Sequence, residues 1–241
     1  MPQHTVASFD ADLKVLDSMI GDMGDGAGRA LSGATKALIG RDVALAQHVI
    51  GADRAIDTLQ HEIEERAVQT IARRQPMAGD LREIVAAMRV ANDLERVGDL
   101  AKNVAKRVVA IGEQRSPVAL AAGLESLGLR VGEQLSAVLK AYRNRDAAGA
   151  MAVWEADGAI DALFTSLFRE LLTYMMEDPR NIGFCIHLMF CAKNIERIGD
   201  HATNIAETVF YMIEGKIIAA ERPKADESIA IDAAMHAPRT S

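Results

Sequence analysis

The chain has 241 residues, of which 49% are hydrophobic and 25% charged, and its 34 acidic against 27 basic side chains give a net charge of −7. A chain of this length can bury a sizeable core, and its acidity argues against a general nucleic-acid binder. Aromatic residues make up 4% and prolines number six, so an all-β fold, which needs many turns and many β-branched or aromatic residues, is disfavoured.

The N-terminal half predicts three long helices. Apolar residues recur at helical spacing over residues 6–38, although glycines weaken the pattern in the middle. Asp42 is an N-cap residue for a second helix over 42–74. Asp80, with a glutamate three residues later as in a capping box, predicts the start of a third helix that runs to about residue 114.

The C-terminal half predicts three more helices. A Ser-Pro pair at Pro117 starts the fourth, because proline suits the first helical turn, and its apolar pattern covers 120–142. The same pattern continues over 146–176 and 178–214, and then it fades. We therefore expect a mobile tail over 216–241.

An internal repeat relates the two halves. Residues 41–59 match residues 145–163 at eleven of nineteen positions, and residues 95–105 match residues 196–206 at seven of eleven. The sequence therefore predicts an all-α fold of six helices that form two repeated antiparallel three-helix bundles. The predicted units are a first repeat over 5–115, a second repeat over 116–215 and the tail over 216–241.

Features of targeting and redox chemistry favour a cytoplasmic protein. The first twelve residues lack the basic and apolar parts of a secretory signal, and no window approaches the ~18 apolar residues of a spanning helix. Cys185 and Cys191 have a spacing that fits neither a CxxC pair nor a four-ligand zinc site, so we expect two buried, reduced thiols.

Acidic residues at i, i+4 spacing recur at equivalent positions of both repeats, so each pair shares one helix face. Like charges at this spacing destabilise a helix by roughly 0.2–0.5 kcal/mol per pair, which indicates that a cation offsets the repulsion. Carboxylates without thiolates suit hard metal ions, and asparagines on the same faces offer carbonyl oxygens. The predicted metal ligands are Asp53, Asp57, Glu95, Asp99 and Asn103 in the first repeat and Asp157, Asp161, Glu196, Asp200 and Asn204 in the second.

A solvated acidic face is the alternative interpretation. Arg96 and Arg197 directly follow the glutamates of the two motifs, but neighbouring residues on a helix point about 100° apart, so neither is well placed to neutralise its own glutamate. Gly98 and Gly199 lie inside the same motifs, and a helix-interior glycine costs roughly 0.5–1 kcal/mol, so we expect close helix approach there.

The motifs ERVGDLAKNVA at 95–105 and ERIGDHATNIA at 196–206 resemble those of the PhoU family of phosphate-uptake regulators, and the aspartate blocks near residues 53 and 157 match that family's other acidic motif. The resemblance implies the PhoU-like fold and a non-enzymatic negative regulator of phosphate uptake and phosphate-starvation signalling. It implies iron, zinc, manganese or magnesium at the acidic motifs.

The same resemblance implies the partners. They are the ATPase subunit of the phosphate-specific ABC transporter, the associated sensor histidine kinase and a second copy of the chain in a homodimer. No nucleic acid is expected, and the protein would reach the inner membrane through its partners.

Two other classes stay open. A carboxylate-bridged di-iron oxidase also uses acidic helical bundles, but such sites usually contain Glu-x-x-His pairs, and no histidine in the chain has a glutamate three residues before it. A plain helical scaffold with a solvated acidic face needs no metal at all.

Overall fold

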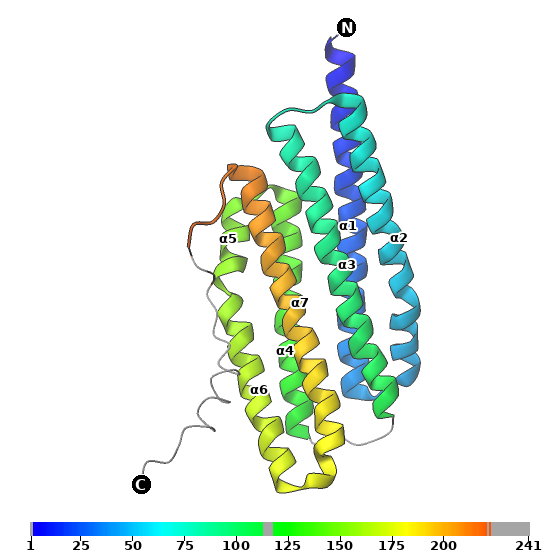
Figure 1. The fold of residues 1–241 in the computed structure, drawn as a ribbon, viewed down its shortest axis with the longest axis vertical. Helices are drawn as coiled ribbons and strands as arrows, with labels where there is room; N and C mark the ends of the chain where they lie inside the picture. The colour runs from blue at the N-terminus through cyan, green and yellow to red at the C-terminus, as the bar shows by residue number, and fades with distance from the viewer. Residues whose placement is uncertain (1, 113–117, 221, 223–241) are drawn as a thin grey trace.

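The structure is a computed structural model that describes residues 2–112, 118–220 and 222. The described residues form two helical bundles that lie side by side, with the helices running along the long axis (Figure 1). The first bundle contains α1 (Pro2–Gly40), α2 (Val43–Arg74) and α3 (Gly79–Ile111). The second contains α4 (Val118–Asn144), α5 (Ala147–Glu155), α6 (Asp157–Glu177), a 3-10 turn η1 (Pro179–Asn181) and α7 (Ile182–Glu214).

Corresponding helices of the two repeats start with the same local structure. Asp42 accepts the amide three residues on at 2.8 Å, and Asp146 does so at 2.9 Å, so each caps the first turn of its helix. The preceding residues Arg41 and Arg145 both have positive φ, at 55° and 51°. The predicted cap at Asp42 is therefore confirmed, and the second repeat uses the same turn.

Helix α3 departs from the prediction at both ends. Asp80 does not cap it, because the helix already begins at Gly79 and its N-cap Ala78 makes no side-chain cap bond. Glu83, expected to complete the capping box, instead accepts a hydrogen bond from Arg145 at 2.9 Å. The helix ends at Ile111, and residues 113–117, where the predicted end near 114 and the predicted start of the next helix fall, lie outside the described residues.

The helix predicted over 146–176 is interrupted at Ala156, where α5 ends and α6 begins one residue later. Gly158 stands where the first repeat has Arg54, and glycine's poor helix propensity weakens the helix beside the break. The two pieces follow one another along one line in Figure 1, so the six-helix plan holds with one helix divided. Likewise, Asp178 caps the turn η1 rather than the last helix, which begins at Ile182.

The contact between the bundles is made mainly by α3 against α7, with α1 against α4 behind them (Figure 1). The apolar stripe of each helix is buried, as for Ile63 and Leu94, and burying such a side chain contributes about 1.5–3 kcal/mol. Cys185 and Cys191 are both free and buried, as predicted, and burial raises the pKa of Cys191 to about 12. These thiols therefore stay protonated at neutral pH.

A junction of polar side chains fixes the second bundle to the first. The Arg145 guanidinium lies 2.9 Å from carboxylate oxygens of both Asp17 on α1 and Glu83 on α3. The buried Tyr142 hydroxyl donates to Asp17 at 2.9 Å, and Arg145 lies over the Tyr142 ring at 5.2 Å. The α4–α5 turn is thus tied to two helices of the other bundle.

Helix α7 ends at Gly215, which has a φ of 68° and allows the chain to leave the helix. Residues 216–220 and 222 are not helical, while the rest of the predicted tail lies outside the described residues. Among the helices that the structure describes, none has the length and apolar content needed to cross a membrane.

Two candidate acidic sites

The first acidic site, which consists of Asp53, Asp57, Glu95 and Asp99, lies between α2 and α3. Asp53 is buried, and the other three side chains are partly buried. Lys102, one turn after Asp99, binds both helices, with its Nζ 2.6 Å from Asp99 Oδ1 and in contact with Asp53 Oδ2. A single ammonium group therefore offsets negative charge on both helices of the site.

Interactions within the first acidic site shift the pKa values of Glu95 and Asp99 in opposite directions. Burial, a hydrogen bond with Asp99 and the negative charges of Asp99 and Asp57 raise the pKa of Glu95. Burial acts against ionisation of Asp99 too, but hydrogen bonds from Lys102 and Glu95 outweigh it and lower the pKa of Asp99. Of these two carboxyls, Glu95 therefore binds a proton first as the pH falls.

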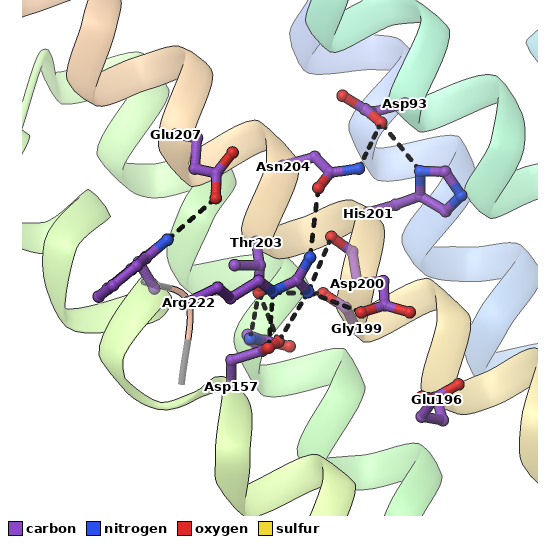
Figure 2. Close-up of polar contacts among 12 residues, drawn as sticks. Asp93, Asp157, Glu196, Gly199, Asp200, His201, Thr203, Asn204, Glu207 and Arg222 are labelled. Atoms are coloured by element: carbon purple, nitrogen blue, oxygen red, sulfur yellow. Dashed lines mark hydrogen bonds and ion pairs between the residues drawn. The ribbon is translucent and has the colours of Figure 1, made fainter. Parts of the chain in front are cut away.

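The second acidic site, which consists of Asp157, Asp161, Glu196 and Asp200, lies between α6 and α7 (Figure 2). Its first three members are buried, at 3%, 5% and 4% exposure, so this site is deeper than the first. Arg222 binds two of these acids, with its Nε 2.7 Å from Asp157 Oδ2 and its Nη2 2.7 Å from Asp200 Oδ1.

Thr203 explains why the second site needs an arginine from elsewhere in the chain. It occupies the position equivalent to Lys102, and its hydroxyl brings a hydrogen bond to Asp157 at 2.8 Å but no charge. Gln134 on α4 donates to the same hydroxyl oxygen at 3.1 Å. The network therefore positions Asp157, while Arg222 supplies the charge.

Glu196 is only partly compensated by its surroundings. Lys193 lies 2.9 Å from its Oε1, but its Oε2 is buried and has no hydrogen-bond partner among the described residues. Burial raises the pKa of Glu196 even though Lys193 acts in the opposite direction, and the charges of Asp200 and Asp161 raise it further.

The paired glycines bring the helices of each site together, as predicted. A Cβ placed on Gly98 would lie 3.0 Å from Ile56 Cδ1, and one on Gly199 would lie 3.0 Å from Ile160 Cδ1. Because Ile56 and Ile160 occupy equivalent repeat positions, both copies use a glycine for the same close contact. The same Cβ on Gly98 would lie 3.3 Å from Asp53 Oδ1, so the contact borders the acidic site.

The structure places the remaining predicted residues differently. Asn103 is exposed, whereas Asn204 accepts a long hydrogen bond from Arg222 and donates one to Asp93, both at 3.5 Å. The expectation that Arg96 could not neutralise its own glutamate is wrong, because its long side chain turns back to place Nε 3.3 Å from Glu95.

The sequence interpretation missed the two cations. The spacing of Lys102 three residues after Asp99 is a signal for an ion pair on one helix face, and the lysine-to-threonine difference between the two motifs marks the asymmetry. No local pattern marks Arg222, because its position depends on the path of the chain after α7. The side chain of His201 lies 2.9 Å from Asp93 across the contact between α3 and α7.

The donor set of both sites fits a hard cation. The buried oxygens Asp53 Oδ1 and Glu196 Oε2 have no hydrogen-bond partner among the described residues, and carboxylates are ligands that iron, manganese and magnesium accept. In the arrangement that the structure describes, however, no three acidic, histidine or cysteine side chains form a group that could hold a metal ion. The carboxylates instead contact Lys102 and Arg222.

Two similar bundles, each with an equivalent acidic site, define a class of tandem-repeat helical proteins. The PhoU domain model matches residues 20–108 and 124–209. The chain is 54% identical over 223 residues, 92% of its length, to the phosphate-specific transport system accessory protein PhoU homolog of Rhizobium meliloti, and the match covers 94% of that protein.

Solved structures agree with the family match. The crystal structure of PhoU from Pseudomonas aeruginosa has a TM-score of 0.83 and 37% identity, covering 86% of this chain and 100% of that one. The phosphate transport system regulatory protein PhoU from Streptococcus pneumoniae has a TM-score of 0.81 and 27% identity, covering 88% of this chain and 100% of that one. The chain belongs to the PhoU family.

Family membership decides two predictions. The all-α fold of six helices in two similar units is confirmed. PhoU is a non-enzymatic family, so the prediction that the chain is not an enzyme is confirmed and the di-iron oxidase alternative loses its support.

Proposed function

We propose that the chain is an accessory protein of a phosphate-specific transport system that represses phosphate uptake and the phosphate-starvation response when phosphate is plentiful. The observation that carries this proposal is the 54% identity, over 92% of the chain, to a phosphate-specific transport system accessory protein. The acidic motifs of both repeats and the solved PhoU structures support it.

The partners in this proposal are the ATPase subunit of the phosphate transporter and the sensor histidine kinase. Two similar bundles present two related surfaces, so one chain can contact two partners, or two copies can contact each other as a homodimer. The net charge of −7 favours basic partner surfaces, because complementary charge speeds and orients association. The proposal places the protein in the cytoplasm, at the inner membrane through its partners.

The proposal includes metal binding at the acidic sites. Asp53, Asp57, Glu95 and Asp99 would hold an ion in the first site, and their equivalents Asp157, Asp161, Glu196 and Asp200 would do so in the second, with Asn103 and Asn204 as further oxygen donors. An iron, zinc, manganese or magnesium ion supplies positive charge and links carboxylates of two helices. The protein's own residues supply the close helix contact at Gly98 and Gly199 that holds those carboxylates in place.

A metal-free acidic scaffold is the second candidate function. The observation that favours it is that Lys102 and Arg222 already neutralise buried aspartates in both sites. Replacing Glu95 by Gln and Asp99 by Asn distinguishes the two candidates by elemental analysis. The metal proposal expects the variant to bind less metal than the wild type. The scaffold candidate expects no bound metal in the wild type or in the variant.

Co-purification tests the partner proposal. The tagged chain, with and without added metal, should retain the transporter ATPase subunit and the kinase, and a protein with Glu95, Asp99, Glu196 and Asp200 neutralised should retain less of both. Replacing the exposed Glu125 by Gln provides a control outside both sites. Failure of the wild-type chain to retain either partner contradicts the proposal.

A further inference from the structure

The two acidic sites are equivalent in their backbone and acids but differ in where their cation comes from. Lys102 belongs to α3 itself, so its ammonium can leave Asp99 by a change of side-chain rotamer while the backbone stays in place. Arg222 lies eight residues beyond Glu214, the last residue of α7, in a segment without regular structure. The cation of the second site therefore tethers a non-helical segment to the bundle, whereas the cation of the first site does not.

Arg222 fills the second site with a full set of polar contacts (Figure 2). Its Nε and Nη2 bind the two oxygens of Asp157 at 2.7 and 3.0 Å, and its Nη2 also binds Asp200 Oδ1 at 2.7 Å. Its Nη1 lies 3.5 Å from Asn204 Oδ1. Asp157, Asp200 and Asn204 are three of the residues expected to bind a metal ion, so a metal and Arg222 require the same oxygens.

Leaving the second site without a cation is unfavourable. Asp157 is 3% exposed, and a buried carboxylate that loses its partner costs several kcal/mol. Arg222 is itself largely covered, with 18% of its side chain exposed. Exchange of the guanidinium for another cation beside Asp157 is therefore favoured over its simple departure.

The segment that carries Arg222 is loosely attached otherwise. Ile217 is 80% exposed, and Ile217, Ile218 and Ala220 line an open cavity of about 520 Å³ together with Trp154 and Glu207. Among the described residues of this segment, Ile218 packs against the hydrophobic core, and the ion pairs of Arg222 provide its other strong attachment.

We propose that Arg222 is a displaceable, tethered counter-ion of the second acidic site. A metal ion that binds Asp157 and Asp200 displaces the guanidinium and releases residues 215–220 together with Arg222, whereas a metal ion in the first site moves only the side chain of Lys102. The chain then has one site whose occupancy changes its surface and one whose occupancy does not. This inference rests on the proposed metal binding.

Trp154 gives a direct readout of this release. It is the single tryptophan of the chain, its indole donates to Glu207 at 3.0 Å, and it lines the cavity beside Ile217 and Ala220. Release of the segment exposes the indole to water and should shift its emission to longer wavelength. Mg²⁺ and Zn²⁺ alone are suitable probes because neither is paramagnetic.

The experiment titrates each ion into the wild-type chain and Arg222→Gln, with calorimetry for affinity and Trp154 emission for release. We expect Arg222→Gln to bind at least tenfold more tightly at one site, and its emission to be shifted before metal is added. Wild-type emission should move to that of the variant as metal binds. Hydrogen exchange at residues 215–220 should rise in parallel.

Two variants serve as controls. Lys102→Gln should tighten metal binding at the first site without moving Trp154 emission. Arg180→Gln removes an exposed arginine that pairs with Asp178 and should change nothing.

The possible outcomes distinguish this inference from the proposal of metal binding on which it depends. If the wild type and Arg222→Gln bind metal with equal affinity and Trp154 emission does not change, then Arg222 does not compete with metal. That result would leave the proposal of metal binding intact. No binding of either ion to any of the proteins overturns both.

Discussion

At the residue scale, neighbouring side chains limit which residue each acidic site can accommodate at particular positions. Gly98 and Gly199 leave just enough room for Ile56 and Ile160, and Glu196 places a buried carboxylate oxygen without a hydrogen-bond partner among the described residues. The sequence allowed the glycines to be predicted, because a helix-interior glycine repeated in both copies indicates close packing. It could not reveal the state of Glu196, because burial and the position of Lys193 depend on the folded bundle.

Replacing Gly98 or Gly199 by alanine should destabilise the protein. The added methyl group would lie 3.0 Å from an isoleucine side chain in each case, and overpacking of this kind costs about 1–3 kcal/mol. Gly132→Ala is the matched control, because no atom lies within 4 Å of a Cβ there and alanine favours a helix. Urea unfolding measures the difference, and equal stabilities of all three variants would contradict the packing account.

Glu196→Gln should stabilise the metal-free protein at neutral pH. Burial raises the pKa of Glu196 from its ordinary value of 4.5, so the folded state disfavours the ionised form. At a pH above the raised pKa, the ionised carboxylate therefore lowers the free energy of unfolding. Below the ordinary value the carboxyl is protonated in both the folded and unfolded states, and the cost disappears. The gain from Gln should therefore be present at pH 7.5 and vanish near pH 4.

Thermal unfolding at both pH values checks this prediction, with the exposed Glu125→Gln as the control. A gain that is the same at pH 4 and pH 7.5 would mean that ionisation of Glu196 is not the cause.

At the scale of the elements, the turns between helices distinguish the two repeats. The turns before α2 and α5 are locally alike, with Arg41 and Arg145 in the same left-handed conformation. Only Arg145 reaches across to the other bundle, where it binds Asp17 and Glu83. The second-repeat turn therefore joins the bundles, and the first does not do so within the described part of the chain.

Arg145→Ala should lower the free energy of unfolding by about 1–2 kcal/mol more than Arg41→Ala, because two ion pairs and the contact with Tyr142 are lost only in the first variant. Both variants place alanine at a positive φ, so the backbone effect is the same in each. The difference between them therefore measures the side-chain contacts of Arg145. Urea unfolding at low and at 0.5 M salt measures it, and the difference should shrink in salt. Equal losses would show that the junction contributes nothing.

Helix positions could be predicted well and helix ends less well. Apolar periodicity predicted each long helix because each buries one stripe, and Asp42 predicted a start because its side chain bonds locally. The break at Ala156 was not predicted, because the apolar spacing continues across it, and α3 begins at Gly79 rather than after a cap at Asp80. Glu83, for example, is used by Arg145 rather than by its own helix.

At the scale of the whole molecule, duplication makes two equivalent acidic sites, and later differences make them unequal. The grouping of the acids was predictable from their i, i+4 spacing and the repeat. The position of Arg222 was not, because no local pattern determines where the chain after α7 crosses the second bundle. If the sites bind metal as proposed, the first is the constant site and the second is the one whose occupancy changes the surface seen by partners.

Repression of the phosphate-starvation response is the most direct test of the account. A strain lacking the gene is complemented with the wild-type chain or with Glu95→Gln, Asp99→Asn, Glu196→Gln and Asp200→Asn combined, and a starvation-responsive reporter is measured in phosphate-rich medium at equal protein levels. The account predicts a high signal without the gene, a low signal with the wild type and a high signal with the combined variant. A low signal without the gene, or repression by the combined variant equal to that of the wild type, would contradict it.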